Sequence, residues 1–83
     1  MDKYLPLTKW LQECNSDPVS LSFSEIEGII GSRLPESAFR HNAWWANTRS
    51  HPNAVAWMNA GYFSSDCSEI ISRKRVNFSK HHI

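Results

Sequence analysis

Residues able to bind an anion or a nucleic-acid base gather in the middle of the chain. Between residues 40 and 53 they are arginines, amides and hydroxyls, namely Arg40, Asn47, Thr48, Arg49, Ser50 and Asn53. Such groups contact phosphates and base edges in protein–DNA interfaces. A second basic group, Arg73, Lys74 and Arg75, lies near the C-terminus. We expect both groups to bind nucleic acid, with duplex DNA as the partner, although a solvated turn would equally explain the second group.

The charges are unevenly distributed along the chain. Residues 1–38 have three basic and six acidic side chains, whereas residues 39–83 have six basic and two acidic ones together with all four histidines. If the two parts form different faces, the second favours an anionic partner, although small domains also acquire such unevenness by chance. The segment 52–60 has no lysine or arginine. A monomer would therefore bind DNA modestly, and a homodimer would supply useful specificity.

The sequence lacks the usual patterns of catalysis and metal binding. His41, Asn42 and His51 could surround one ion only if a hairpin and a following helix brought them together, and the first two lie in aperiodic sequence. The two cysteines and the C-terminal histidine pair lack the spacing of a zinc site. Neither a nucleophile elbow nor a glycine-rich loop occurs. We expect no metal, no cofactor and no enzymatic activity.

Length and composition are typical of a single domain covering residues 1–83. A chain of 83 residues is near the size at which one hydrophobic core suffices without disulfides or metal, and its ten aromatic residues help to fill that core. It has no run of about 18 apolar residues and no signal-peptide pattern. We expect a cytoplasmic protein that does not enter a membrane and keeps Cys14 and Cys67 as free thiols.

The first half of the chain predicts a helix, a strand and a second helix. Apolar residues recur at spacings of three and four over residues 4–14, which is one face of a helix. Residues 19–23 alternate apolar side chains with serines, the period of a half-buried strand. Ser24 and Glu27 match a capping box, so we expect the second helix to begin at Ser24. Gly31 suits the left-handed residue that ends a helix.

A third helix is expected over residues 52–59. Ser50 or His51 can cap it, Pro52 suits its first position and Gly61 ends it. Its inner face is expected to contain Ala54, Trp57 and Met58, with Asn53, Val55, Ala56 and Asn59 nearer the outside. Before it, residues 34–39 are expected to form one or two turns, and residues 40–50 an ordered loop.

Two strands are expected after this helix, over residues 62–67 and 76–78, joined as a hairpin with the basic residues 73–75 near its turn. Three helices, a short strand and a C-terminal β-hairpin give the order of a winged helix-turn-helix domain, an α+β fold. Residues 32–50 form a much longer connection than the three or four residues of a tight helix-turn-helix. An unrelated α+β sandwich is the alternative.

The tryptophans are expected to be structural anchors. Trp44 and Trp45 lie in the aperiodic loop and Trp57 in the third helix. A chain this short needs its largest apolar side chains inside, and duplex DNA has no exposed base faces on which a tryptophan could stack. We expect at least one of Trp44 and Trp45 to fix the loop to the core beside Trp57.

Residues 20–62 contain a series of motifs: Phe-x-x-Ile-Glu, Leu-Pro-x-Ser-Ala, Trp-Trp-x-Asn, and Ala-x-Ala-Trp-x-x-Ala-Gly before an aromatic residue. The matching positions are Phe23, Ile26, Glu27, Leu34, Pro35, Ser37, Ala38, Trp44, Trp45, Asn47, Ala54, Ala56, Trp57, Ala60, Gly61 and Tyr62. This pattern resembles a family of small bacterial and phage-associated domains, found alone or attached to larger proteins. The resemblance covers about half of the chain and implies a compact independent module. The chain departs from it at Ser64 and Ser65, where a more apolar strand is expected.

Two functions follow from these observations. The first is a DNA-binding module, with a possible regulatory use, that contacts duplex DNA through residues 40–53 and 73–75. The second is a protein-interaction module, such as a phage-encoded inhibitor or an antitoxin-like protein, that presents the same aromatic segment to a partner protein. They differ in salt response, because phosphate contacts weaken steeply with salt and a tryptophan-anchored contact does not.

Overall fold

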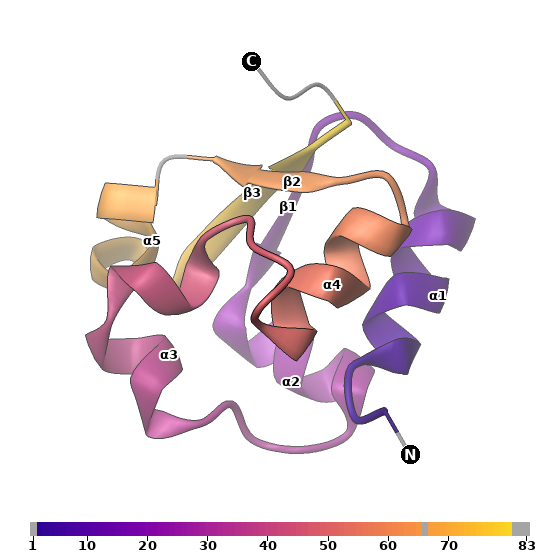
Figure 1. The fold of residues 1–83 in the computed structure, drawn as a ribbon. Helices are drawn as coiled ribbons and strands as arrows, with labels where there is room; N and C mark the ends of the chain where they lie inside the picture. The colour runs from indigo at the N-terminus through magenta and orange to yellow at the C-terminus, as the bar shows by residue number, and fades with distance from the viewer. Residues whose placement is uncertain (1, 66, 81–83) are drawn as a thin grey trace.

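A computed structural model describes residues 2–65 and 67–80, and for Cys67 it describes the backbone alone. The helices are α1 (Leu5–Cys14), α2 (Phe23–Ile30), α3 (Glu36–Arg40), the 3₁₀ helix η1 (Asn42–Trp45), α4 (Pro52–Asn59) and α5 (Cys67–Arg73). The strands are β1 (Val19–Ser22), β2 (Phe63–Ser65) and β3 (Arg75–Ser79). The α+β class is therefore confirmed, with five α-helices and one three-stranded sheet in the described residues (Figure 1).

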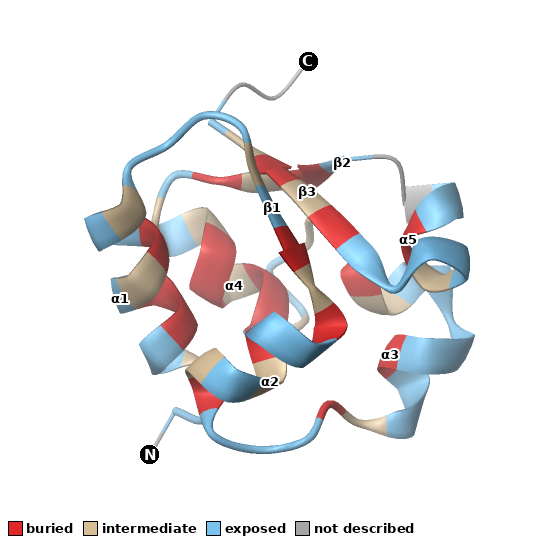
Figure 2. Cartoon of the chain, turned by 180° about the vertical axis from the view of Figure 1, so that it is seen from behind, coloured by how far each residue is buried: buried red, intermediate tan, exposed pale blue. Residues whose placement is uncertain are grey.

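The three strands form an antiparallel sheet in the order β1-β3-β2. In the central strand, Val76 lies opposite Leu21 of β1, and Phe78 lies opposite Ser64 of β2. These four side chains are buried, and their neighbours along each strand point to the other face because side chains alternate. Figure 2 shows that other face uncovered by the described helices, with α4 behind the strands, α1 at the left and α2 below the end of β1. The core therefore lies between the sheet and these helices.

Helix α1 matches the predicted helix to within one residue at its start. Leu7 and Leu11 are buried on its inner face. Between them, Thr8 is also buried, and its hydroxyl donates a hydrogen bond of 2.8 Å to the carbonyl of Ala56 in α4. This bond satisfies the buried hydroxyl and fixes the position of α4 against α1.

The cap of α2 is Ser22, two residues before the predicted Ser24. The Ser22 hydroxyl accepts from the Glu25 amide at 3.1 Å, and the Glu25 carboxylate accepts from the Ser22 amide at 2.8 Å. These reciprocal bonds are a capping box. The end of helix α2 follows the prediction, because Gly31 has the left-handed φ of +74°.

The prediction of Ser24 and Glu27 was wrong because the sheet determines where α2 begins. Ser22 is the last residue of β1 that pairs with β3, and the next amide, that of Phe23, donates to the Lys74 carbonyl at 2.9 Å. Glu27 has another role: its carboxylate accepts from the Leu34 amide at 2.9 Å and so fixes the segment that follows α2.

Helix α4 has the predicted bounds, and Gly61 follows it with a φ of +87°. The predicted inner face is only partly correct. Asn53 and Ala56 were expected nearer the outside, but both are buried, whereas Met58 is half-buried. The buried face is rotated because Ala56 of α4 contacts α1, while Trp57 packs against Phe78 of the sheet.

Strands β2 and β3 pair as predicted, but a helix joins them in place of a hairpin turn. Strand β2 ends at Ser65 and not at residue 67, and α5 follows. Within α5, Ile70 is buried against neighbouring elements, which include η1 and α3. Two consecutive isoleucines suit a strand as well as a helix, so only this packing identifies the element. Lys74, with a φ of +51°, then turns the chain into β3.

Two further expectations concern the thiols and the membrane. Cys14 is a free thiol, whereas the side chain of Cys67 lies outside the described residues, as does the histidine pair at 81 and 82. No helix among the described residues is long and apolar enough to cross a membrane.

The cap assignment can be tested with two serines that are two residues apart. Ser22→Ala should lower the free energy of unfolding by about 0.5–2 kcal/mol, because an orphan amide of α2 loses its acceptor. Ser24→Ala, an exposed position within the first turn, should change it by less than about 0.5 kcal/mol. Urea unfolding followed by tryptophan fluorescence measures both, and a larger loss for Ser24→Ala would contradict the assignment.

Candidate nucleic-acid interface

Trp45 anchors the segment before α4 to the core, as the sequence predicted. Its side chain is 1% exposed, and its indole Nε1 donates to the Ala38 carbonyl at 2.8 Å. The ring stacks on Phe23 at a centroid distance of 4.9 Å and lies nearly parallel to Trp57 at 6.1 Å. Trp45 therefore connects η1 with both α2 and α4.

Trp44 is half-buried and lies beside Trp45. Its ring makes edge contacts with Trp45 at 4.6 Å and with Tyr4 at 6.2 Å between centroids. Its backbone carbonyl accepts a hydrogen bond of 2.7 Å from the side-chain amide of Asn53. Since Asn53 is 3% exposed, this predicted DNA contact lies in the interior and supports η1.

Asn47 joins the segment before α4 to two other elements. Its Oδ1 accepts from Trp57 Nε1 and from the Ser64 amide, each at 2.8 Å, and lies 3.1 Å from Ser64 Oγ. Its Nδ2 donates to the Ser64 carbonyl at 3.0 Å. Asn47 therefore links α4 and β2, although the sequence suggested it as a DNA contact.

These bonds also explain the serine at position 64, where an apolar residue was expected. Ser64 is buried, and its hydroxyl lies 2.6 Å from the Trp45 carbonyl as well as 3.1 Å from Asn47 Oδ1. A buried hydroxyl needs such partners. The polar residue in β2 thus belongs to the hydrogen-bond network that fixes residues 45–47.

The residues just before α4 form an exposed turn. The Thr48 hydroxyl lies 2.9 Å from the Ser50 hydroxyl and accepts from the Ser50 amide at 3.3 Å. Between them, the exposed Arg49 donates from Nη1 to Oδ1 of Asn59 at 3.1 Å. The structure therefore brings Arg49 to the far end of α4, ten residues along the chain.

Asn59, like Asn53, was placed on the outer face of the helix by sequence. It lies six residues after Asn53, a rotation of about 240° around the helix axis. The two asparagines therefore face different sides, and Asn59 is exposed while Asn53 is buried. Helical rotation was the signal that could have separated them.

His51 precedes α4 without capping it through its side chain. Of the two expected cap residues, His51 occupies the cap position, although its side chain makes no capping hydrogen bond. Its Nδ1 is buried and has no hydrogen-bond partner among the described residues. No set of three or more His, Cys, Asp or Glu side chains could hold a metal within the described part of the chain.

Two arginines of the second group, Arg73 and Arg75, lie beside acidic partners, as does Arg40. Arg40 pairs with Glu36 at 2.8 Å and Arg73 pairs with Glu69 at 3.3 Å, in each case one helical turn apart. All four side chains are largely exposed, so each ion pair contributes little and can be exchanged for another anion.

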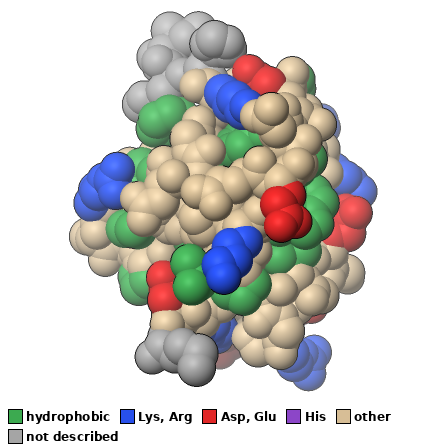
Figure 3. All heavy atoms as spheres, turned by 90° about the vertical axis from the view of Figure 1, so that its right-hand side faces the viewer, with side chains coloured by type: hydrophobic (Ala, Val, Ile, Leu, Met, Phe, Trp, Pro, Cys, Tyr) green, Lys and Arg blue, Asp and Glu red, His purple; other side chains and the backbone are tan. Residues whose placement is uncertain are grey.

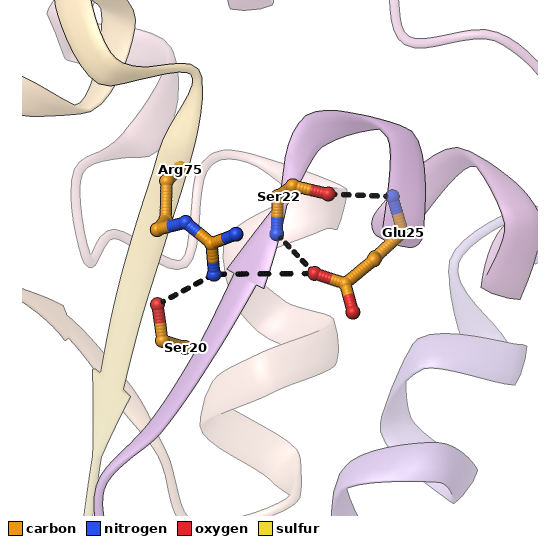
Figure 4. Close-up of polar contacts among 4 residues, drawn as sticks. All are labelled: Ser20, Ser22, Glu25 and Arg75. Carbon is orange, nitrogen blue, oxygen red and sulfur yellow. Dashed lines mark hydrogen bonds and ion pairs between the residues drawn. The ribbon is translucent and has the colours of Figure 1, made fainter.

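Arg75 belongs to a polar cluster on the uncovered face of the sheet. Its Nη1 donates to Ser20 Oγ at 3.1 Å and lies 4.0 Å from the Glu25 carboxylate (Figure 4). The Ser22 amide, followed by the Ser22 hydroxyl, lowers the pKa of Glu25 by hydrogen bonding, and the charge of Arg75 acts in the same direction. This arrangement links the start of β3 with the capping box of α2.

The nine predicted contacts therefore do not form one cluster. The segment before α4 lies in front in Figure 1, whereas β1 and β3 lie in front in Figure 2, which is the view from behind. A third side, shown in Figure 3, has basic and acidic side chains scattered over a mostly neutral surface. The turn before α4 brings three of the contacts, Thr48, Arg49 and Ser50, close to Asn59. Three others lie at the junction of α5 and β3, namely Arg73, Lys74 and Arg75.

One stretch of the chain is distinguished by its lack of acidic residues. No aspartate or glutamate occurs between Glu36 and Asp66. This stretch contains η1, the turn that follows it and all of α4, and within these residues, 42–59, Arg49 is the only formal charge. An anion approaching Arg49 along α4 therefore meets no carboxylate from this stretch.

These features define a small α+β domain in which an anchored turn presents an arginine beside an exposed amide of an uncharged helix. Residues 4–80 match the family described as Domain of unknown function (DUF7662), and the chain belongs to that family. Comparison with curated proteins found no match, and comparison with solved structures found none either.

The role of Asn47 can be tested against another asparagine of the same region. Asn47→Ala should lower the free energy of unfolding by about 2 kcal/mol or more, because Trp57 and Ser64 lose buried partners. Asn42→Ala, at an exposed position in η1, should change it by less than about 0.5 kcal/mol. Chemical unfolding followed by circular dichroism provides the comparison. Equal losses for the two variants would show that the Asn47 bonds do not hold the fold together.

Proposed function

We propose that this chain is a duplex-DNA-binding module whose contact surface is the exposed side of α4 together with Thr48, Arg49 and Ser50. The observation that supports this most directly is the bond between Arg49 and Asn59, two exposed side chains in the acid-free stretch. Arginine and asparagine are the residues that most often recognise guanine and adenine in the major groove.

The shape of this surface is suited to the major groove. An α-helix fits that groove, and contacts with bases come from its outward-facing side chains. On α4, Pro52 and Asn59 are exposed, with the half-buried Val55 and Met58 beside them. None of these side chains repels a phosphate. Asn47 and Asn53 support the turn from inside, so we leave them out of the contact surface.

The order of elements adds support by analogy. As in a winged helix, a first helix and strand are followed by further helices and two paired strands, and the early strand β1 joins the late strand β3. On this analogy α4 is the recognition helix and α5 replaces the turn of the wing. Arg73, Lys74 and Arg75 would then contact a flanking phosphate backbone. The two arginines would exchange their exposed carboxylate partners for phosphates at little cost.

The DNA proposal is tested by fluorescence anisotropy with a labelled mixed-sequence duplex. The affinity should fall at least about tenfold between about 50 and 200 mM salt. Each phosphate contact releases cations from the DNA, and this release becomes less favourable as the salt concentration rises. Arg49→Ala should weaken binding about fivefold or more at the lower salt concentration. Arg33→Ala removes an equal charge from the exposed connection between α2 and α3, so it should have a smaller effect. No binding at the lower salt concentration would refute the proposal.

A protein partner is the second candidate, and the same helix face is the reason to retain it. The outward side of α4 has no charged side chain, and Val55 and Met58 are only half-buried on it. Such a face also suits an apolar protein contact. The affinity for such a protein partner would depend little on salt concentration, whereas the affinity for DNA would fall steeply. The salt dependence therefore distinguishes the two candidates.

A further inference from the structure

The bond between Arg49 and Asn59 also indicates which base the surface would recognise. Resting on the proposed function, we infer that these two side chains act as a pair that recognises guanine in the major groove, with Arg49 as the contacting residue and Asn59 as the residue that positions it. The two residues are ten positions apart in the chain, so their contact is seen only in the structure.

The hydrogen-bonding capacity of the pair favours guanine over adenine. Arginine has five N–H donors and no acceptor, and one of them is used on Asn59 Oδ1 at 3.1 Å. Because Asn59 Oδ1 already accepts from Arg49, the groups that the pair presents to a ligand are mainly donors. Guanine presents two acceptors in the major groove, N7 and O6, whereas adenine presents one acceptor and one donor.

The position of the pair makes it available to a base. Both side chains are exposed, and they lie beside the outward face of α4, which has no carboxylate. An isolated exposed arginine has many rotamers, whereas the bond to Asn59 limits those of Arg49 before DNA arrives. Limiting the conformations of a contact residue reduces the entropy lost on binding.

A chemical change in the DNA tests this inference without altering the protein. In 7-deazaguanine a C–H group replaces N7, so one acceptor is lost from the major groove while Watson–Crick pairing remains. The wild-type chain should bind a fully substituted duplex at least about fivefold more weakly than the unsubstituted one. A duplex with 7-deazaadenine in place of adenine should bind with nearly unchanged affinity.

Protein variants show whether the preference comes from this pair. Arg49→Lys retains the charge but loses the planar fork, so it should bind both duplexes with similar affinity. Asn59→Ala should also lose most of the preference, although it leaves every charge in place. Asn42→Ala, an exposed amide in η1, should keep the full preference of the wild type. Thermal melting checks that each variant is folded.

The outcomes distinguish the inference from the function on which it rests. Equal binding of the guanine and 7-deazaguanine duplexes, or a larger loss with 7-deazaadenine, would overturn guanine recognition while leaving DNA binding intact. A preference that persists in Asn59→Ala would overturn the positioning role of Asn59. Failure to bind any of the duplexes would overturn the proposed function itself.

Discussion

The hydrogen bonds of one side chain, Asn47, fix the irregular part of this fold. The segment from Ala46 to His51 has no regular structure of its own, so its position depends on bonds to other elements. Asn47 supplies them by bonding to Trp57 in α4 and to Ser64 in β2. The stacked rings of Trp45 and Trp57 support the same place through apolar contact. Polar bonds in such a partly buried site are strong and directional, so they define one conformation.

Because the segment is fixed in this way, its neighbouring side chains have one of two roles. Some hold the segment from inside, and others form the exposed contact surface. Trp45, Trp57 and Asn53 lie inside and hold the segment in place. As a consequence, Arg49 leaves the turn close to α4 and meets Asn59 on the exposed side. The proposed base-contacting surface is therefore small and held by the core, and the basic residues at the junction of α5 and β3 are assigned only to the flanking phosphate backbone.

The sequence correctly predicted elements that have a regular apolar pattern or clear signals at their ends. Predictions from sequence were wrong where contacts between distant parts of the chain determine the local structure. Helix α4 follows from proline and glycine signals at its ends, and its bounds were correct. Two pairs of residues match a capping box, Ser22 with Glu25 and Ser24 with Glu27. Helix α2 begins at the first pair because Ser22 is also paired with β3 in the sheet. In the same way, nothing in an aperiodic segment shows that Asn47 turns inward.

The central claim is that the exposed side of α4 and the turn before it meet DNA. A titration of the ¹⁵N-labelled chain with a short duplex, followed by amide chemical shifts, tests it at each residue. The account predicts the largest shifts at Thr48, Arg49 and Ser50, at Val55, and at the side-chain amide of Asn59. Shifts confined to α1 or to the uncovered face of the sheet, with these residues unchanged, would contradict it.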